Sequence, residues 1–135
     1  MAVLETAPAA PTRPVRIVTV DAQPFFREAA RAIVSRITGF EIVGESASGE
    51  AAIPLSRELD PDMVLLDVRM TGLDGIETAR RLSAEDPTRV VVLVSSADVD
   101  ELSSLAEGCG AAAIVSKQWL NPLLLRGLWM ALRRR

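Results

Sequence analysis

The sequence has 135 residues, of which 49% are hydrophobic and 24% are charged, a balance typical of one folded globular domain. Its net charge of −3 argues against a domain that binds nucleic acid through general electrostatic attraction. The sequence has no histidine and one cysteine, which excludes histidine-based zinc sites, histidine-dependent catalysis and an internal disulfide.

The first 14 residues are rich in alanine and proline and show no periodicity. We therefore expect 1–14 to be a flexible tail, followed by one domain over 15–133. No apolar run approaches the ~20 residues that span a bilayer, and the N-terminus lacks the pattern of a secretory signal. Together with the single cysteine, these features favour a cytoplasmic protein with no membrane partner.

Five short runs of mainly branched aliphatic residues alternate with amphipathic segments along the domain. The runs are 15–20, 40–45, 62–67, 89–94 and 111–116. Runs this continuous suit strands that are covered on both faces. The alternation therefore predicts an α/β sandwich of three layers, with a parallel sheet between two layers of helices.

The segments between the first runs carry helix signals. Over 24–37, apolar residues recur at helical spacing, and Pro24 suits the first position of a helix. The segment 48–59 has a weaker helical pattern that contains Pro54. Because proline removes a backbone donor, we expect Pro54 to kink or shorten this helix.

Two further helices are expected near the C-terminus. Asp98 and Glu101 have the spacing of a capping box, and Asn121 with Pro122 forms a good helix start. The last helix is unusually apolar, because its large apolar residues cannot all face one core: Leu123, Leu124, Leu125, Leu128, Trp129, Met130 and Leu132. Part of it should therefore be exposed or covered by a partner, with Trp119 beside it.

Polar residues stand at the ends of four of the five predicted strands. Asp21 follows the first, Asp67 ends the third, Ser95 and Ser96 follow the fourth, and Lys117 follows the fifth. The carboxyl ends of parallel strands meet at one edge, where ligands of such sheets bind. Two carboxylates, a hydroxyl and an ammonium group suit phosphoryl transfer, with magnesium beside a carboxylate nucleophile.

The sequence closely resembles the receiver domain of two-component response regulators, especially those of the LuxR/NarL type, over about 15–133. Four motifs carry the resemblance: VTVDAQPFFREAAR, PDMVLLDVRMTGLDGIETARRL, VVVLVSS and GCGAAAIVSK. It implies a flavodoxin-like fold, in which a doubly wound five-stranded parallel sheet in the order 2-1-3-4-5 has helices on both faces.

The resemblance also implies a role for individual residues. Asp67 would accept a phosphoryl group from a sensor histidine kinase, and Lys117 would pair with that group. Ser95 would be the switch hydroxyl, chosen over Ser96 because its spacing to Lys117 matches the family. The protein would then act as a signalling switch that regulates transcription, and not as an enzyme. It would be either a stand-alone receiver or part of a longer transcription factor.

A magnesium ion is the cofactor that the resemblance implies. Asp21, Asp67 and the backbone carbonyl of Arg69 would be its ligands. Ala22 stands where the family normally has a second metal-binding acid. We therefore expect a weakened magnesium site, because one carboxylate has been lost.

Other departures from the family leave an alternative open. Thr71 replaces a proline, Ile114 replaces an aromatic residue and Gln118 replaces a proline or an aspartate. With Ala22, they are compatible with an interaction module that uses little or no phosphorylation and acts through constitutive dimerisation or a partner. In either case, we expect the face of the fourth helix, fifth strand and fifth helix to form a homodimer or to bind a partner. A phosphatase with an Asp-x-Asp nucleophile motif is disfavoured, because Arg69 stands where the second acid belongs.

Overall fold

The computed structural model describes residues 13–70, 72–97 and 99–133, apart from the side chain of Glu101. Its strands are β1 (Val15–Val20), β2 (Phe40–Ser46), β3 (Met63–Asp67), β4 (Val90–Ser95) and β5 (Ala113–Ser116). Its helices are α1 (Pro24–Ser35), α2 (Gly49–Leu59), α3 (Gly75–Glu85), α4 (Val99–Ala106), the short 3-10 helix η2 (Lys117–Trp119) and α5 (Pro122–Leu132).

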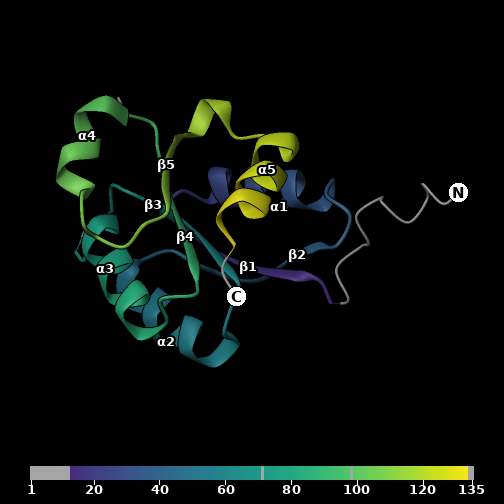
Figure 1. Cartoon of the computed structure of the whole chain (residues 1–135), viewed down its shortest axis with the longest axis horizontal. Helices are drawn as coiled ribbons and strands as arrows, with labels where there is room; N and C mark the ends of the chain where they lie inside the picture. The colour runs from purple at the N-terminus through teal and green to yellow at the C-terminus, as the bar shows by residue number, and fades with distance from the viewer. Residues whose placement is uncertain (1–12, 71, 98, 134–135) are drawn as a thin grey trace, which may run out of the picture.

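The five strands form one parallel sheet in the order β2-β1-β3-β4-β5, which confirms the predicted order (Figure 1). The first strand, β1, lies next to the edge of the sheet; the chain then forms the edge strand β2 and crosses back to build β3, β4 and β5 on the other side of β1. The strand order therefore reverses between β1 and β3, and ligand sites of such sheets lie beyond the strand ends at this reversal.

Helices cover both faces of the sheet, as predicted, because its strands turn alternate apolar side chains to opposite faces. On one face, α2, α3 and α4 pack on residues that include Val18, Leu66 and Leu93. On the other face, α1 and α5 pack on residues that include Ile17 and Leu65. Two separate apolar clusters thus hold the central strands between layers of helices.

The element bounds differ little from those predicted. β5 is shorter than the expected run, and the other strand bounds differ by at most one residue. The second helix extends from Gly49 through Pro54 to Leu59, so the expected shortening is wrong. Pro54 lies in its second turn, where the loss of one backbone donor is tolerated, and the Ser48 side chain accepts from Ala51 N at 3.1 Å to cap the helix.

Two expectations concern residues that lie wholly or partly outside the described ranges. The tail 1–14 is described only at its last two residues, where Arg13 forms an ion pair with Asp62 at 2.7 Å. The capping box of Asp98 and Glu101 also lies outside the described part. None of the helices in the described ranges is both long enough and apolar enough to span a bilayer.

The last helix begins as expected, since Asn121 accepts a hydrogen bond from Leu124 N at 2.9 Å and Pro122 takes the first helical position. Leu125 is its buried residue, whereas Leu123 is 80% exposed. The prediction that this apolar helix is partly exposed is confirmed. Trp119, in η2, is also exposed, while Trp129 packs against the apolar cluster under α1 and α5.

Candidate functional site

The four predicted polar positions lie at the carboxyl edge of the sheet. Asp21 follows β1, while Asp67 and Ser95 are the last residues of β3 and β4. Asp67 pairs in register with Val94, and Ser95 pairs with Ser116, the residue before Lys117. Parallel register therefore brings residues far apart in the sequence to one edge.

Asp21 is fixed by contacts on both its backbone and its side chain. Its backbone N–H donates to Ser46 O at 3.0 Å, and its carboxylate Oδ1 accepts from Gln23 N at 2.8 Å. Arg27 Nη1 donates to the backbone carbonyl of Asp21 at 2.5 Å. Asp21 is only 1% exposed, so its charge requires a nearby compensating group.

Lys117 supplies that compensating charge. Its Nζ lies 2.7 Å from Asp21 Oδ2 and 3.6 Å from Asp67 Oδ1. The shorter contact is an ion pair, and it supplies the opposite charge for the buried Asp21 Oδ2. The structure thus brings Asp21, Asp67 and Lys117 together, with the ammonium closer to Asp21.

Phe26 is a member of the site that the sequence did not reveal. The Lys117 ammonium lies 4.6 Å from the centroid of the Phe26 ring, a geometry that allows a cation–π attraction. Phe26 is one of the apolar residues at helical spacing over 24–37, and it belongs to the buried cluster under α1. The contact of Phe26 with Lys117 joins α1 to η2, and no spacing pattern in the sequence indicates it.

The surroundings of Asp67 shift its pKa in opposite directions. Burial raises its pKa above the ordinary aspartate value of 3.8, and the neighbouring Asp21 carboxylate raises it further. The Lys117 ammonium and the backbone N–H of Arg69, which is 3.4 Å from Asp67 Oδ1, lower the pKa. The raising effects dominate, so the charged carboxylate is less favourable in the folded protein than in water.

This shift predicts a pH-dependent stabilisation by Asp67→Asn. A raised pKa means that the folded state binds the proton more tightly, so wild-type stability falls as pH rises above 3.8 through the folded pKa. The amide avoids this loss. We expect Asp67→Asn to be more stable than wild type at pH 7, and the difference to disappear below the ordinary aspartate pKa. Urea unfolding of both proteins from pH 3 to pH 7 measures it; a difference that is constant with pH would contradict the explanation.

The two other predicted site residues have distinct environments. Ser95 is buried, and its Oγ accepts from Ala97 N at 3.0 Å, whereas Ser96 is exposed. Arg69 has an exposed side chain just beyond β3. Their predicted roles as switch hydroxyl and carbonyl ligand remain predictions.

The donor atoms at this edge fit a magnesium ion that keeps several of its waters. Asp21 and Asp67 supply carboxylate oxygens, of which Asp21 Oδ2 is paired with the Lys117 ammonium, and hard oxygen donors are those that magnesium prefers. Within the described ranges, no group of three or more histidine, cysteine, aspartate or glutamate residues could hold a metal. Asp21 and Asp67 would therefore supply only two carboxylates to the ion, and water would fill much of its coordination shell.

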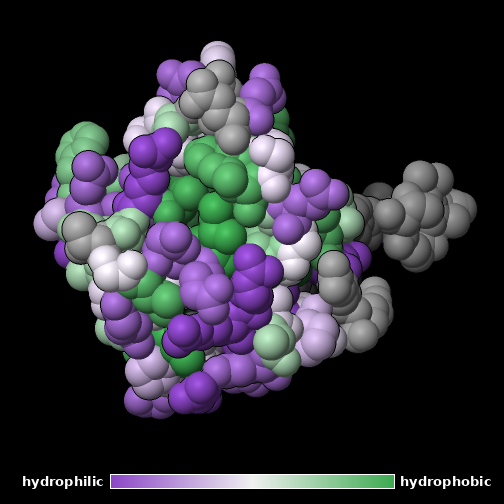
Figure 2. Space-filling model, turned by 90° about the vertical axis from the view of Figure 1, so that its left-hand side faces the viewer, coloured by the Kyte–Doolittle hydropathy of each residue, from purple (hydrophilic) through white to green (hydrophobic). Residues whose placement is uncertain are grey.

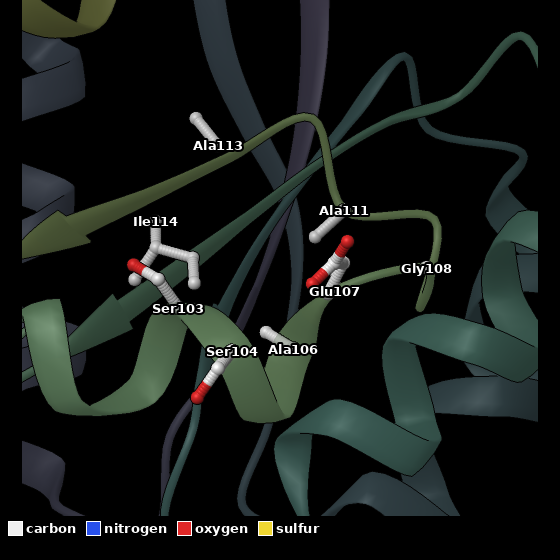
Figure 3. A pocket seen from close by; sticks show the side chains of 8 residues that line it. All are labelled: Ser103, Ser104, Ala106, Glu107, Gly108, Ala111, Ala113 and Ile114. Atoms are coloured by element: carbon white, nitrogen blue, oxygen red, sulfur yellow. The ribbon is translucent and has the colours of Figure 1, made fainter.

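A separate hollow of about 340 Å³ lies between α4 and β5. Figure 3 shows Ile114 of β5 and Ser103 of α4 on its wall, with Glu107 and Ala111 at the end of α4 and before β5. Viewed from the side on which α4 lies, the surface has an apolar area framed by polar side chains (Figure 2). Ile114 occupies the position where the resemblance expects an aromatic ring.

Comparison with known proteins agrees with this geometry. The sequence matches the family described as "Response regulator receiver domain" over residues 17–127. It is 34% identical to the response regulator GacA of Pseudomonas viridiflava over 103 residues, which is 76% of this chain and 48% of GacA. It is 35% identical to the nitrate/nitrite response regulator NarL of Escherichia coli over 97 residues, 70% of this chain and 45% of NarL.

Solved structures give the same result. The signal receiver domain of the putative response regulator NarL from Mycobacterium tuberculosis superimposes with a TM-score of 0.81 and 30% identity, covering 91% of this chain and 99% of that one. The chain spans about half the length of the curated GacA and NarL relatives that it matches. With the predicted fold confirmed and its polar edge in place, the chain belongs to the response regulator receiver domain family, with relatives of the LuxR/NarL type.

Proposed function

We propose that this receiver domain accepts a phosphoryl group on Asp67 from a sensor histidine kinase and thereby switches a protein–protein surface. The observation that carries the proposal is the convergence of Asp67, Asp21 and Lys117 at the carboxyl edge of the sheet. The 135 residues contain no histidine, so the phosphohistidine donor lies outside this sequence.

The chemistry uses groups that are already in place. A carboxylate oxygen of Asp67 attacks the phosphorus of phosphohistidine, a new P–O bond forms as the P–N bond breaks, and the imidazole leaves. The Lys117 ammonium, 3.6 Å from Asp67 Oδ1, neutralises charge on the phosphoryl oxygens. Ser95, one residue beyond the register partner of Asp67, donates its hydroxyl to the phosphoryl group.

Magnesium held by Asp21, Asp67 and the backbone carbonyl of Arg69 would add Lewis-acid neutralisation of the transferring group. Asp21 stays in place through its bonds to Gln23 and Ser46. The Lys117 ammonium stands nearest to Asp21, so it must share that carboxylate with the cation.

The output surface proposed here consists of α4, β5 and α5. Leu105, Leu123 and Met130 are exposed large apolar side chains of its helices, and Trp119 of η2, the short helix that joins β5 to α5, is exposed as well. Apolar patches with a tryptophan anchor suit protein partners, which supports a homodimer or another partner on this face. Light scattering before and after phosphorylation tests this part. Regulation of transcription and a cytoplasmic location belong to the same proposal, and membership of the response regulator receiver family supports them.

We expect incubation with acetyl phosphate and magnesium to add one phosphate-sized mass to the intact protein. Because Asp67 is the proposed nucleophile, Asp67→Asn should remain unmodified under the same conditions. Mass spectrometry of both proteins reads the result directly. An unmodified wild type would refute phosphorylation, and a gain that persists in Asp67→Asn would refute the acceptor.

A binding module that acts without phosphorylation is the alternative that the sequence left open through Ala22 and Ile114. The comparisons give it no support, since the related proteins are named as response regulators. The absence of any mass gain on wild type, at every magnesium concentration, would favour it.

A further inference from the structure

The loop between β3 and α3 begins directly after Asp67 and is fixed at its base by backbone contacts. Val68 N donates to Val94 O at 3.0 Å, and Gly75 N donates to Val68 O at 2.9 Å. A Cβ on Gly75 would lie 2.1 Å from Asp67 O, so the helix start packs directly on the backbone of Asp67. The two ends of the loop are therefore held close together beside the site.

The far part of the loop is held by a side chain from another helix. Glu50, in the first turn of α2, accepts a hydrogen bond from Leu73 N at 2.8 Å through Oε2. A Cβ on Gly72 would lie 2.5 Å from the same oxygen, so the carboxylate lies against the loop backbone. The hydrogen bond from Leu73 is also the main reason why the pKa of Glu50 lies below the ordinary glutamate value.

The start of α2 is a firm support for this contact. Ser48 caps the helix by accepting from Ala51 N at 3.1 Å. A Cβ on Gly49 would lie 2.1 Å from Thr78 Oγ1 and 2.8 Å from Leu73 O, which shows how closely the helix start meets the loop and α3. Only a glycine permits this approach, so the backbone next to Glu50 has little room to move.

The same helix start is connected to Asp21. Ser46 Oγ donates to Ser48 O at 2.8 Å, and Asp21 N donates to Ser46 O at 3.0 Å. Short polar links therefore join the backbone of Asp21, the end of β2 and the helix that carries Glu50. The start of α2 therefore contacts both proposed metal-binding segments: the residues around Asp21 and the β3–α3 loop.

The loop sequence explains why such an anchor matters. Residues 68–74 contain no proline and include Gly72, whose φ is +78°. Proline would restrict the unfolded and folded loop, and glycine leaves it more freedom. A contact from another helix therefore adds to the order of this loop.

We propose that Glu50 is a positioning residue for the Asp67 site: by accepting from Leu73 N, it fixes the β3–α3 loop and thereby the Arg69 carbonyl proposed as a magnesium ligand. This role for Glu50 rests on the proposed function, in which magnesium binds beside Asp67. Glu50 touches the loop and does not touch the reacting groups, so its effect must appear in how well the loop is ordered.

The test compares Glu50→Ala and Glu50→Gln with wild type and with Glu58→Ala, a change of an exposed glutamate on the same helix. In protein without phosphoryl donor, hydrogen exchange at the Leu73 amide should be about fivefold faster in Glu50→Ala. Exchange in Glu50→Gln should stay near that of wild type, because the amide oxygen can still accept. Glu58→Ala should not change it.

Titration with magnesium alone, followed by backbone amide shifts at Asp67 and Arg69, reads the positioning effect. We expect Glu50→Ala to raise the magnesium Kd about threefold, with recovery in Glu50→Gln and an unchanged urea midpoint. Unchanged Leu73 exchange would overturn the contact, and faster exchange with an unchanged Kd would reduce Glu50 to a local structural role. Since neither reading needs phosphorylation, failure of wild type to accept a phosphoryl group would refute the proposed function separately.

Discussion

Lys117→Met should lower the free energy of unfolding by about 3–5 kcal/mol at pH 7, as expected when one partner of a buried ion pair is removed. Methionine keeps most of the length and apolar volume of the lysine chain. The variant loses only the charge that lies 2.7 Å from Asp21 and 3.6 Å from Asp67. Urea unfolding monitored by tryptophan fluorescence measures the loss.

The size of this effect follows from burial. Asp21 is 1% exposed and the Lys117 side chain 12% exposed, so water cannot replace the ammonium as a partner. Two carboxylates would then face each other without a compensating cation. Removal of Lys117 also removes an influence that lowers the pKa of Asp67, so that pKa should rise further. Part of the lost stability should therefore return as the pH falls and Asp67 binds a proton.

A double-mutant cycle with Asp21→Asn isolates the pair. If the cost comes from the uncompensated carboxylate of Asp21, Lys117→Met should cost about 2 kcal/mol less in the Asp21→Asn background. An equal loss in both backgrounds would assign the effect to packing against Phe26 instead. The cycle needs neither metal nor phosphate, so it tests the resting site alone.

The fold could be predicted closely because its signals are local. The branched aliphatic runs of β1, β3 and β4 are continuous and lie in the buried centre of the sheet. β5 is shorter than its run because Ala111 and Ala112 lie before the paired residues, and small apolar residues do not mark a boundary. Pro54 shows a different limit, since tertiary packing of α2 overrides a helix-breaking preference.

For the site, the sequence predicts which residues meet at the strand ends, but not how they contact each other. Parallel topology places Asp21, Asp67 and Lys117 at one edge, and that much follows from the sequence. The preference of the ammonium for Asp21 over Asp67 depends on distances below 4 Å, which no spacing rule supplies. Contacts between separate helices and loops, such as those of Phe26 and Glu50, were missed for the same reason.

Ala22→Asp should raise the affinity for magnesium at least about tenfold. The site now has Asp21 and Asp67 against one ammonium, and Ala22 is exposed directly beside Asp21. A unit charge 4 Å from another contributes about 4 kcal/mol at an effective dielectric near 20, and about twice that for a divalent ion before dehydration. Even a small remaining fraction of this gross energy exceeds the ~1.4 kcal/mol that corresponds to a factor of ten.

Lys117 provides the probe for this measurement, since it is the only lysine in the sequence. Selective isotope labelling of lysine gives a single side-chain NMR signal, located 2.7 Å from Asp21, whose shift can be followed as magnesium is added. Because the cation and the ammonium share Asp21, binding should move this signal. The magnesium Kd is then read from one resonance in each variant.

Two controls separate charge at the site from other effects. Ala22→Asn adds a side chain of the same shape without the charge, and Ala32→Asp adds the charge at an exposed position in the third turn of α1. Neither should tighten binding by more than about twofold, because the first lacks the carboxylate and the second acts through screened solvent. If Ala22→Asn matched Ala22→Asp, the gain would not be electrostatic. If Ala22→Asp bound magnesium as weakly as wild type, position 22 would not face the metal, and the missing acid would not account for a weakened site.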